Sequence, residues 1–436
     1  MPHQARSSLL YRFGPHPDDV YYHRHLIYDL SLLGDPAGLD KYNYPNLHKL
    51  TIDCAKNKDP GRERGVSLEL TEMFPLLVHL TLNSVKITTT SWLGLSAHCH
   101  IRTLQLYCVW IEADDTPAFW RACEKLESLE LRKTTIAGGC APDEVVFERM
   151  RKLIVIETEH LNIAAQLELF LRCPKLVEVK WGIGEYEDDE QPTLITHPLP
   201  SGYWPHLDKL SIDCNLQDID LASLLEGVGE GQGNIVNLQL VGCTLRRQAF
   251  KALDLHFHVL VDLDLEDCYS AESYAFRDIL CCCSRLENLR ARSVLANDIV
   301  EGGPWVCQQL RELKICFLFD QEEQDLQQLV FERLSTLVRL ERLIMHYPLY
   351  DVYEHYHVLE FQLERGLIQL ACLKQLTTLD FVVFSSPYIP QLGTEEVAWM
   401  GFNWKKLTRV SGMLNKDPQE CTRLKNALEL FKITTA

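Results

Sequence analysis

One short phrase, leucine-x-x-leucine-x-leucine with occasional replacement by another apolar residue, recurs along most of this 436-residue chain. It occurs fourteen times, and the first positions of successive copies lie 24 to 36 residues apart. The copies begin at Leu47, Leu77, Ile101, Leu126, Met150, Leu176, Leu207, Ile235, Leu260, Leu286, Leu310, Leu340, Leu376 and Leu407. Most of these spacings suit an array in which each repeat is one small structural unit that stacks on its neighbours.

Each copy predicts a β-strand that is followed by a helix. The second and third apolar positions are two residues apart, so in an extended strand they point to the same face. Segments between copies, such as NIAAQLELFLRCPKL and RRQAFKALDLHFHVL, repeat apolar residues at intervals of three and four, as an amphipathic helix requires. The sequence therefore predicts an α/β leucine-rich-repeat solenoid of about fourteen β-α units, curved, with a parallel sheet on its concave face.

The repeats also suggest how the chain is organised. Residues 44–415 are expected to form the solenoid as a single domain. Residues 1–43 are expected to be an N-terminal cap or a remnant segment, with one short helix around Val20 to Leu33. Residues 416–436 are expected to form a C-terminal capping helix.

Charge and hydropathy exclude some classes of partner. The net charge is −18, which disfavours nucleic acid because phosphate contacts need a basic face. No apolar run approaches the roughly 20 residues of a membrane helix, and residues 1–10 lack the apolar stretch of a secretory signal. We therefore expect a cytoplasmic or nuclear monomer with a protein partner on the concave face, and neither nucleic acid nor membrane as a ligand.

The cysteines follow the repeats. Four of them lie three residues before the first position of a copy, and two lie three residues after its third position. These six are Cys123, Cys173, Cys283 and Cys307, then Cys243 and Cys268. Free cysteine is among the most buried residue types, and intracellular compartments keep thiols reduced. We expect buried free thiols rather than disulfides or metal ligands.

The cysteine-containing copies resemble those of F-box leucine-rich-repeat proteins. The likeness is carried by CEKLESLEL, CPKLVEVKW, CSRLENLRA and CQQLRELKI. YPNLHKLTIDC and WPHLDKLSIDC are similar to repeat openings in fungal F-box-like proteins, and GTEEVAWMGFNWKKLTRVSGMLN resembles the closing unit of that group. The resemblance covers roughly residues 44–415. It implies a substrate receptor of a cullin ubiquitin ligase that binds a Skp-type adaptor through an F-box.

Residues 1–43 depart from that family because they lack the helical pattern and the Leu-Pro opening of an F-box. The chain is then either an F-box-less relative or the product of a gene prediction that lost the N-terminal part. Binding of the Skp-type adaptor is expected only if an F-box was lost in this way. Two further classes of function stay open, a Ran-type GTPase-activating protein and a structural scaffold. The tail KDPQECTRLKNALELFKITTA is mixed rather than strongly acidic, which fits the Ran-type protein poorly.

Catalytic and metal signatures give no further lead. The chain has no GxSxG elbow, HExxH helix or GxxxxGK[ST] loop, so we expect no catalytic residue and no cofactor. Zinc needs about four ligands, and histidines near helix-to-strand turns can instead bind the last carbonyls of a helix, so no metal is expected. The histidines in question form four His-x-His pairs: His23/His25, His98/His100, His256/His258 and His355/His357.

Side chains that alternate with the buried strand positions form the candidate partner surface. Ile154 and Ile156 alternate with the buried Leu153 and Val155, so they are expected to form an exposed apolar patch, a common mark of contact sites. The alternative is that the insertion over residues 182–206 covers both. Residues of types enriched at interface hot spots would frame the patch, namely Tyr107 and Arg132, together with Glu130.

A second candidate surface is charged and lies on the ninth and tenth copies. The ninth copy presents Asp262, Asp264 and Glu266, and the tenth presents Arg290 and Arg292. In a parallel sheet in register, Asp264 would flank Arg290 and Glu266 would flank Arg292. Two interpretations remain open: these are cross-strand ion pairs of a few tenths of a kcal/mol each, or they contact the partner.

Overall fold

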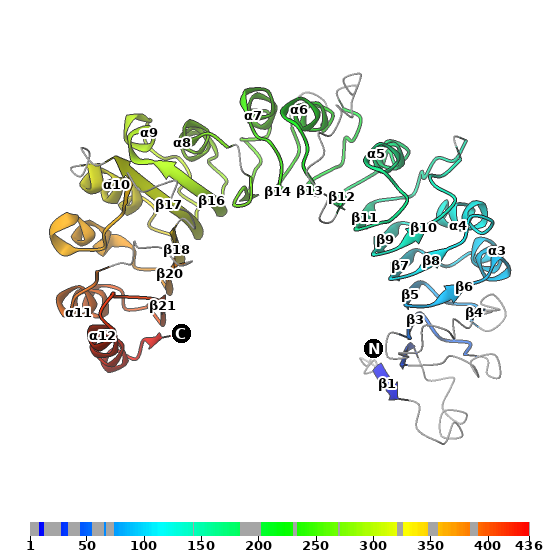
Figure 1. The fold of residues 1–436 in the computed structure, drawn as a ribbon, viewed down its shortest axis with the longest axis horizontal. Helices are drawn as coiled ribbons and strands as arrows, with labels where there is room; N and C mark the ends of the chain where they lie inside the picture. Colours follow the sequence, from blue (N-terminus) through cyan, green and yellow to red (C-terminus); the bar gives the residue numbers. More distant parts are fainter. Residues whose placement is uncertain are drawn as a thin grey trace, which may run out of the picture. The chain divides into compact units, whose positions relative to one another are not determined.

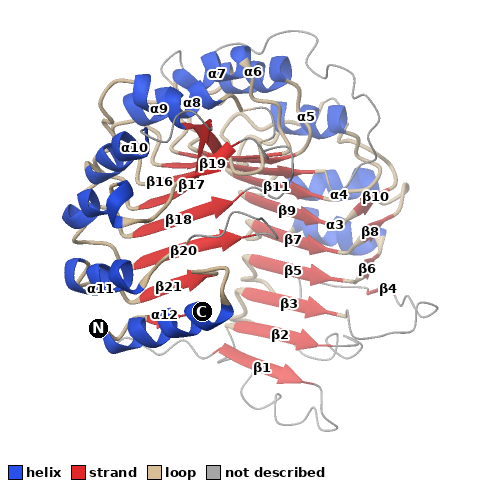
Figure 2. Cartoon of the chain, turned by 60° about the vertical axis from the view of Figure 1, so that its left-hand side comes forward, coloured by secondary structure: helices blue, strands red, loops and turns tan. Residues whose placement is uncertain are grey.

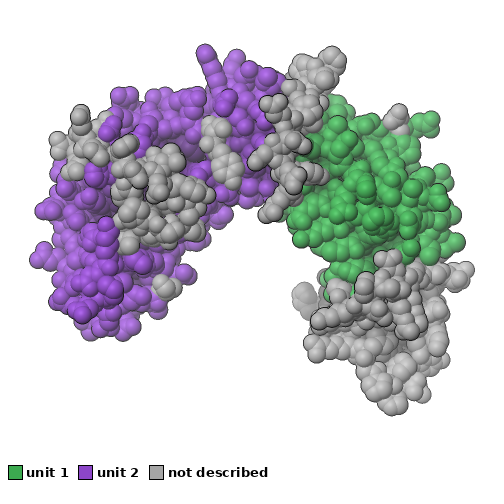
Figure 3. Space-filling model, viewed as in Figure 1, with its two compact units in different colours: residues 1–196, 202–208 green, residues 197–201, 209–436 purple. Residues whose placement is uncertain are grey.

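The computed structural model describes residues 8–12, 28–33, 44–54, 65–66, 74–142, 144–183, 202–229, 233–268, 271–320, 326–347, 356–383 and 391–435. Strands and helices alternate, and in each of two units the strands lie on one side and the helices on the other (Figures 1 and 2). Unit 1 contains residues 1–196 and 202–208, and unit 2 contains residues 197–201 and 209–436 (Figure 3). The segment boundaries at residues 43 and 415 stay predictions.

Unit 1 contains a parallel sheet whose strands pair in chain order. They are β1 (Ser8–Arg12), β2 (Asp29–Leu33), β3 (Lys49–Asp53), β5 (His79–Asn83), β7 (Thr103–Tyr107), β9 (Ser128–Arg132), β11 (Lys152–Ile156) and β12 (Glu178–Gly182). Its helices are α3 (Thr89–Ala97), α4 (Thr116–Cys123) and α5 (Ile163–Leu171). Two short parallel pairs join β4 (Gly65–Val66) to β6 (Lys86–Ile87) and β8 (Trp110–Ile111) to β10 (Thr135–Ile136).

Unit 2 repeats this plan. Its parallel strands are β13 (Lys209–Asp213), β14 (Asn237–Val241), β15 (Asp262–Asp264), β16 (Asn288–Leu295), β17 (Glu312–Asp320), β18 (Arg342–Tyr347), β20 (Thr378–Val383), β21 (Arg409–Gly412) and β22 (Thr434–Thr435). Strand β19 (Tyr356–Val358) pairs antiparallel with the end of β17. The helices are α6 (Asp218–Glu226), α7 (Arg247–Asp254), α8 (Ser273–Cys282), α9 (Ala296–Glu301), α10 (Leu326–Ser335), α11 (Thr394–Asn403) and α12 (Pro418–Leu430), with 3₁₀ turns at Leu363–Arg365 and Leu367–Cys372.

The repeated phrase sets the register of the sheet. In unit 1 its second position is Leu80, Leu104, Leu129 and Leu153, and these four residues are directly paired across β5, β7, β9 and β11. All four are buried between sheet and helices. Burying one leucine side chain contributes about 1.5–3 kcal/mol, and a one-residue slip would turn every leucine of a strand to the other face. The predicted leucine-rich-repeat fold is confirmed.

The repeats begin earlier than the sequence analysis recognised. Asp29–Leu33 is strand β2, paired in register with β3, so the predicted helix around Val20 to Leu33 is wrong over its last five residues. Leu30 and Leu32 are buried. They belong to LIYDLSL, which carries the same phrase starting at Ile27. Residues 20–27 lie outside the described part of the chain.

Directly after four strands of unit 1, the backbone adopts the same unusual conformation. Each strand is followed by a non-glycine residue with a left-handed backbone, at φ between 49° and 54°. The four are Ser84, Cys108, Lys133 and Glu157. Each of their amides donates to the carbonyl of the last residue of the next strand, as from Cys108 to Arg132 at 2.9 Å and from Glu157 to Gly182 at 2.8 Å. This bond extends the ladder by one step and turns the chain toward the helix side.

All sixteen cysteines are free thiols, and the repeat-locked ones are buried as predicted. The Cys243 thiol donates to the carbonyl of Cys214 at 3.3 Å, and the Cys268 thiol donates to the carbonyl of Cys243 at 3.0 Å. Burial raises the pKa of the Cys307 thiol to about 12. The repeat-locked cysteines are therefore core residues, and Cys243 and Cys268 also link successive repeats.

Candidate functional site

In each unit the sheet has one side that none of the described helices of that unit covers, visible as the open side of the strands in Figure 2. We call it the helix-free face. In the five-residue strands β5, β7, β9 and β11, for example, the first, third and fifth residues line it, because side chains alternate along a strand. It is the face that the sequence analysis assigned to the partner.

On unit 1 a chain of hydrogen bonds crosses this face from strand to strand. Thr81 of β5 donates its hydroxyl hydrogen to Oε1 of Gln105 on β7 at 2.8 Å. Gln105 in turn donates from Nε2 to Oε2 of Glu130 on β9 at 2.8 Å. All three are third residues of their strands, so the ladder places them about 4.8 Å apart. The side chains are therefore held in one orientation before any partner arrives.

Glu130 is the centre of this network. It is buried, with 6% of its surface exposed, and it accepts hydrogen bonds from Arg132 and Tyr107 as well as from Gln105. Burial raises the pKa of Glu130, but the bonds from Arg132 and Tyr107 and the charge of Arg132 outweigh it, so the pKa is lowered overall. Burial and the Glu130 carboxylate together raise the pKa of the Tyr107 hydroxyl. An ionised Glu130 therefore orients the partly exposed Tyr107 and Arg132, and the structure brings these three predicted residues together.

The predicted apolar patch is not present as expected. Ile154 is only 3% exposed, so the expectation that it faces solvent is wrong, whereas Ile156 is partly exposed. Ile154 is paired between Glu130 and Lys180, two residues with long side chains on strands about 4.8 Å away. The sequence pattern could not show this, because alternation describes one strand and not its neighbours.

The insertion proposed to cover the isoleucines is described only at its two ends, residues 182–183 and 202–206. Within residues 202–208, the Tyr203 hydroxyl donates to the carbonyl of Leu171 at 2.5 Å, and Trp204 donates from Nε1 to the carbonyl of Phe170 at 3.4 Å. This part of the insertion therefore packs against α5, on the helix side of the sheet. Residues 184–201 lie outside the described residues.

On unit 2 the helix-free face carries a row of alternating charges. Asp264 and Arg290 are directly paired, as predicted, and Arg290 Nη1 lies 3.4 Å from Asp264 Oδ2. Arg290 also donates from Nε to Oε1 of Glu312 on β17 at 2.9 Å, and Glu312 Oε2 accepts from Arg342 on β18 at 2.5 Å. Glu312 and Arg342 were missed in the sequence. Glu312 is buried, so it is the acid that two arginines share.

The second predicted charge pair is wrong. Glu266 forms its ion pair with Lys314 of β17, not with Arg292. Strand β15 ends at Asp264, and the pairing of β16 with β17 shifts between Arg290 and Ser293, so register is lost beyond Arg290. Asp262 remains in the ladder and accepts a hydrogen bond from Asn288.

Arg292 instead lies near His346 of β18. Burial lowers the pKa of His346. The charge of Glu266 raises this pKa, whereas the charges of Lys314 and Arg292 lower it further. Four of the charged residues predicted on unit 2, Asp264, Glu266, Arg290 and Arg292, thus interact with charged or titratable residues in repeats that run from β15 to β18.

Two histidines of the His-x-His pairs, His98 and His256, contact backbone carbonyls. His98 Nε2 lies 2.8 Å from the carbonyl oxygen of Phe74, and His256 Nε2 lies 3.1 Å from that of Leu225 in the last turn of α6. His23, His25 and His355 lie outside the described residues. In the part of the chain that is described, no group of three His, Cys, Asp or Glu side chains could hold a metal ion. No helix in that part is long and apolar enough to cross a membrane.

Comparison with known proteins gives structural likeness alone. No protein-family profile and no curated protein matches the chain. One similar solved structure, the crystal structure of a TLR13–ssRNA13 complex, is 13% identical, with a TM-score of 0.43, over 89% of this chain and 61% of that chain. Another, of the mouse RP105/MD-1 complex, is 13% identical, with a TM-score of 0.43, over 92% of this chain and 66% of that chain. The chain spans less than two thirds of the length of either. By its own repeats and its strands in register, it is an α/β leucine-rich-repeat solenoid.

Proposed function

We propose that this chain is a non-catalytic protein-recognition solenoid whose helix-free face contacts the partner. The observation that carries the proposal is the network around Glu130, in which a buried ionised carboxylate holds a tyrosine and an arginine at the surface. Tyrosine and arginine are enriched at interface hot spots. Side chains that are already ordered lose less entropy on binding, which favours affinity.

The charge distribution supports a protein as the partner. The chain carries a net charge of −18, and the described face of unit 2 alternates acids with bases, as in Asp264, Arg290, Glu312 and Arg342. A nucleic acid needs a continuous basic surface, whereas a mixed-charge surface can match a protein of complementary pattern. The proposal includes a monomer that acts in the cytoplasm or nucleus.

Its finer form is an F-box-like substrate receptor of a cullin ubiquitin ligase, or an F-box-less relative. The cysteine-containing repeats support it, because the cysteines at their fixed positions are core residues here. Mixing the purified chain with a Skp-type adaptor and measuring complex formation by size-exclusion chromatography tests the adaptor contact. We expect no stoichiometric complex, because residues 1–43 lack the F-box pattern. A stoichiometric complex would support the ligase role and refute the F-box-less form of the proposal.

A paired set of variants tests the helix-free face. Tyr107→Ala with Arg132→Ala removes the two ordered side chains. Trp110→Ala with Arg121→Ala removes an exposed aromatic and an exposed arginine of β8 and α4, outside that face. Affinity purification with quantitative mass spectrometry should show proteins that the first variant loses and the second retains. Identical recoveries with both variants would refute the assignment of the partner to this face.

A further inference from the structure

A row of cations follows the edge of unit 1 at which its strands begin. The residue just before the first apolar position is cationic or histidine in four successive repeats: Lys125, Arg149, Lys175 and His206. Parallel strands in register hold equivalent residues about 4.8 Å apart. Together with Arg151, directly before β11, these residues form what we call the cationic edge.

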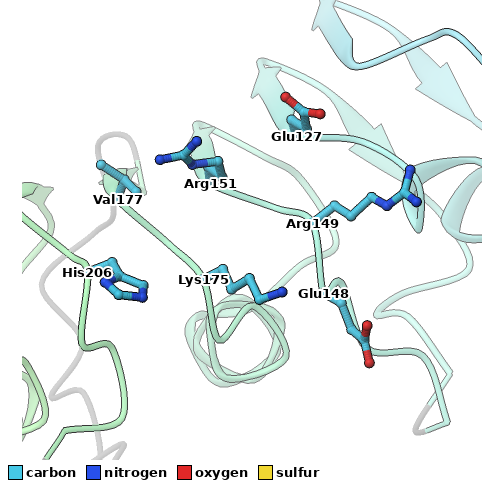
Figure 4. Close-up of a pocket in the computed structure, with 7 residues that line it drawn as sticks. All are labelled: Glu127, Glu148, Arg149, Arg151, Lys175, Val177 and His206. Carbon is cyan, nitrogen blue, oxygen red and sulfur yellow. The ribbon is translucent and has the colours of Figure 1, made fainter.

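A pocket of about 450 Å³ opens on the cationic edge. The labelled side chains in Figure 4 come from loops of successive repeats: Glu127, Glu148, Arg149, Arg151, Lys175, Val177 and His206. Backbone bonds hold these loops together. The amide of Arg151 donates to the carbonyl of Glu127 at 2.8 Å, and that of Val177 donates to the carbonyl of Arg151 at 2.7 Å. The pocket is therefore built on the ladder itself rather than on a free loop.

The charges of the pocket are not balanced within the protein. Among the described residues, Arg149, Arg151 and Lys175 form no ion pair with an acid. Glu127 has a partner elsewhere, since Arg102 lies 3.3 Å from it. Glu148 is then the one lining carboxylate without an ion pair in the described part of the chain. A chain with a net charge of −18 thus keeps three unpaired cations around one pocket.

The same edge of unit 2 provides a partial contrast: among its described residues Arg285 also forms no ion pair, but three other cations of the edge have side-chain partners. Arg311 lies 3.5 Å from Glu287 and 3.7 Å from Glu341. Arg339 donates to Gln309 of the preceding repeat, and Lys406 donates to Gln375 of its own preceding repeat at 2.5 Å. A neighbouring repeat can therefore supply a partner for a cation at this edge, as it does for Arg311, whereas three cations of the unit 1 pocket have none among the described residues.

We propose that the cationic edge of unit 1 binds an acidic peptide segment of a partner protein, with a carboxylate or phosphate group in the pocket. Guanidinium groups bind either oxyanion with two parallel hydrogen bonds. An extended peptide places every second side chain about 6.6–7 Å further along, so successive acidic side chains can reach successive cations of the row. A long polyanion would also meet the acidic remainder of the protein, which repels it. The site lies apart from the helix-free face and shares with the proposed function only the class of partner.

The experiment is a fluorescence-polarisation titration with a labelled peptide of alternating glutamate and serine. The test variant is Arg149→Gln with Arg151→Gln and Lys175→Gln. The matched control is Arg311→Gln with Arg339→Gln and Lys406→Gln, which removes the same charge from the edge of unit 2. We expect the test variant to weaken binding at least about tenfold, since three charge-assisted contacts are lost, and the control to stay within about twofold. Circular dichroism checks that both variants fold.

Further titrations distinguish a phosphate ligand from a carboxylate ligand. The same peptide with phosphoserine in place of serine shows whether phosphate or carboxylate fills the pocket, and a preference for either supports the site. The proposed site would be overturned if neither peptide binds, or if both triple variants weaken binding equally. Tighter binding of oligo-uridine than of both peptides would also overturn it. Tyr107→Ala with Arg132→Ala should retain peptide binding. Loss of binding in that variant would move the peptide to the helix-free face and overturn the edge site.

Discussion

His256 Nε2 lies 3.1 Å from the carbonyl oxygen of Leu225, which belongs to the preceding repeat. The other ring nitrogen, Nδ1, accepts a hydrogen bond from the amide of Ile235 at 3.3 Å, so Nε2 carries the proton and donates to Leu225. The ring is fully buried, and burial lowers its pKa to about 4 against the opposing effect of the Leu225 carbonyl. A neutral imidazole thus joins one repeat to the next.

We expect acid to weaken unit 2 through His256. The unfolded imidazole titrates near pH 6.5, so between about pH 6.5 and 4 the unfolded state binds more protons than the folded state. The stability that the neutral His256 gives to the folded state is complete above this window. It falls as the pH drops through the window, by about 3 kcal/mol at most. Urea unfolding across the window measures it. His256→Gln should be less stable at neutral pH but less sensitive to acid, and a variant with the same pH dependence as the wild type would contradict the assignment.

The burial of Ile154 leads to a second prediction. Ile154→Asp should lower the melting temperature almost as much as Leu153→Asp does, because an unpaired buried carboxylate costs several kcal/mol and would stand next to the ionised Glu130. Ile156→Asp, at a partly exposed position, should cost much less. Thermal unfolding followed by circular dichroism compares the three variants. A melting temperature of Ile154→Asp close to that of the wild type would show that the side chain is accessible after all.

Glu312 should matter more to stability than Asp264, although both contact Arg290. Glu312 is buried and bonded to two arginines, whereas Asp264 is more exposed and 3.4 Å from its partner. Glu312→Gln should lower the free energy of unfolding by about 1–3 kcal/mol, and Asp264→Asn by less than about 1 kcal/mol. Chemical denaturation of both variants provides the comparison. Equal costs would mean that burial does not distinguish the two acids.

The left-handed conformation of Cys108 predicts a stabilising substitution. At φ 52° a side chain costs about 1–2 kcal/mol, which exceeds the extra entropy that glycine loses on folding, about 0.5–1 kcal/mol. Cys108→Gly should therefore raise the free energy of unfolding by up to about 1 kcal/mol, while Cys108→Val should lower it. Cys99→Gly is the control, because Cys99 is also exposed but has no positive φ. Stabilisation by both glycine variants would exclude backbone strain as the reason.

The spacing of one phrase was enough to locate the strands. Each of its fourteen copies coincides with a strand of the structure, because a single repeat cannot bury its apolar face and must align it with its neighbours. The pairing of Asp264 with Arg290 followed from the same register. Strand β2 could also have been found, since LIYDLSL carries the phrase, but the segment was expected to form the short helix around Val20 to Leu33 instead.

Only the tertiary structure decided which side chains are exposed and which charges meet. Alternation places Ile154 on the helix-free face, yet its side chain is buried there between the strands β9 and β12 with which β11 pairs. Glu266 reaches Lys314, 48 residues away, because β15 ends early and the next ladder shifts. The cationic edge likewise differs from its counterpart in unit 2 at Arg311, which forms ion pairs with Glu287 and Glu341 of the adjacent repeats. Periodicity is a property of one segment of chain, whereas burial and charge pairing depend on side chains that folding brings together from separate repeats.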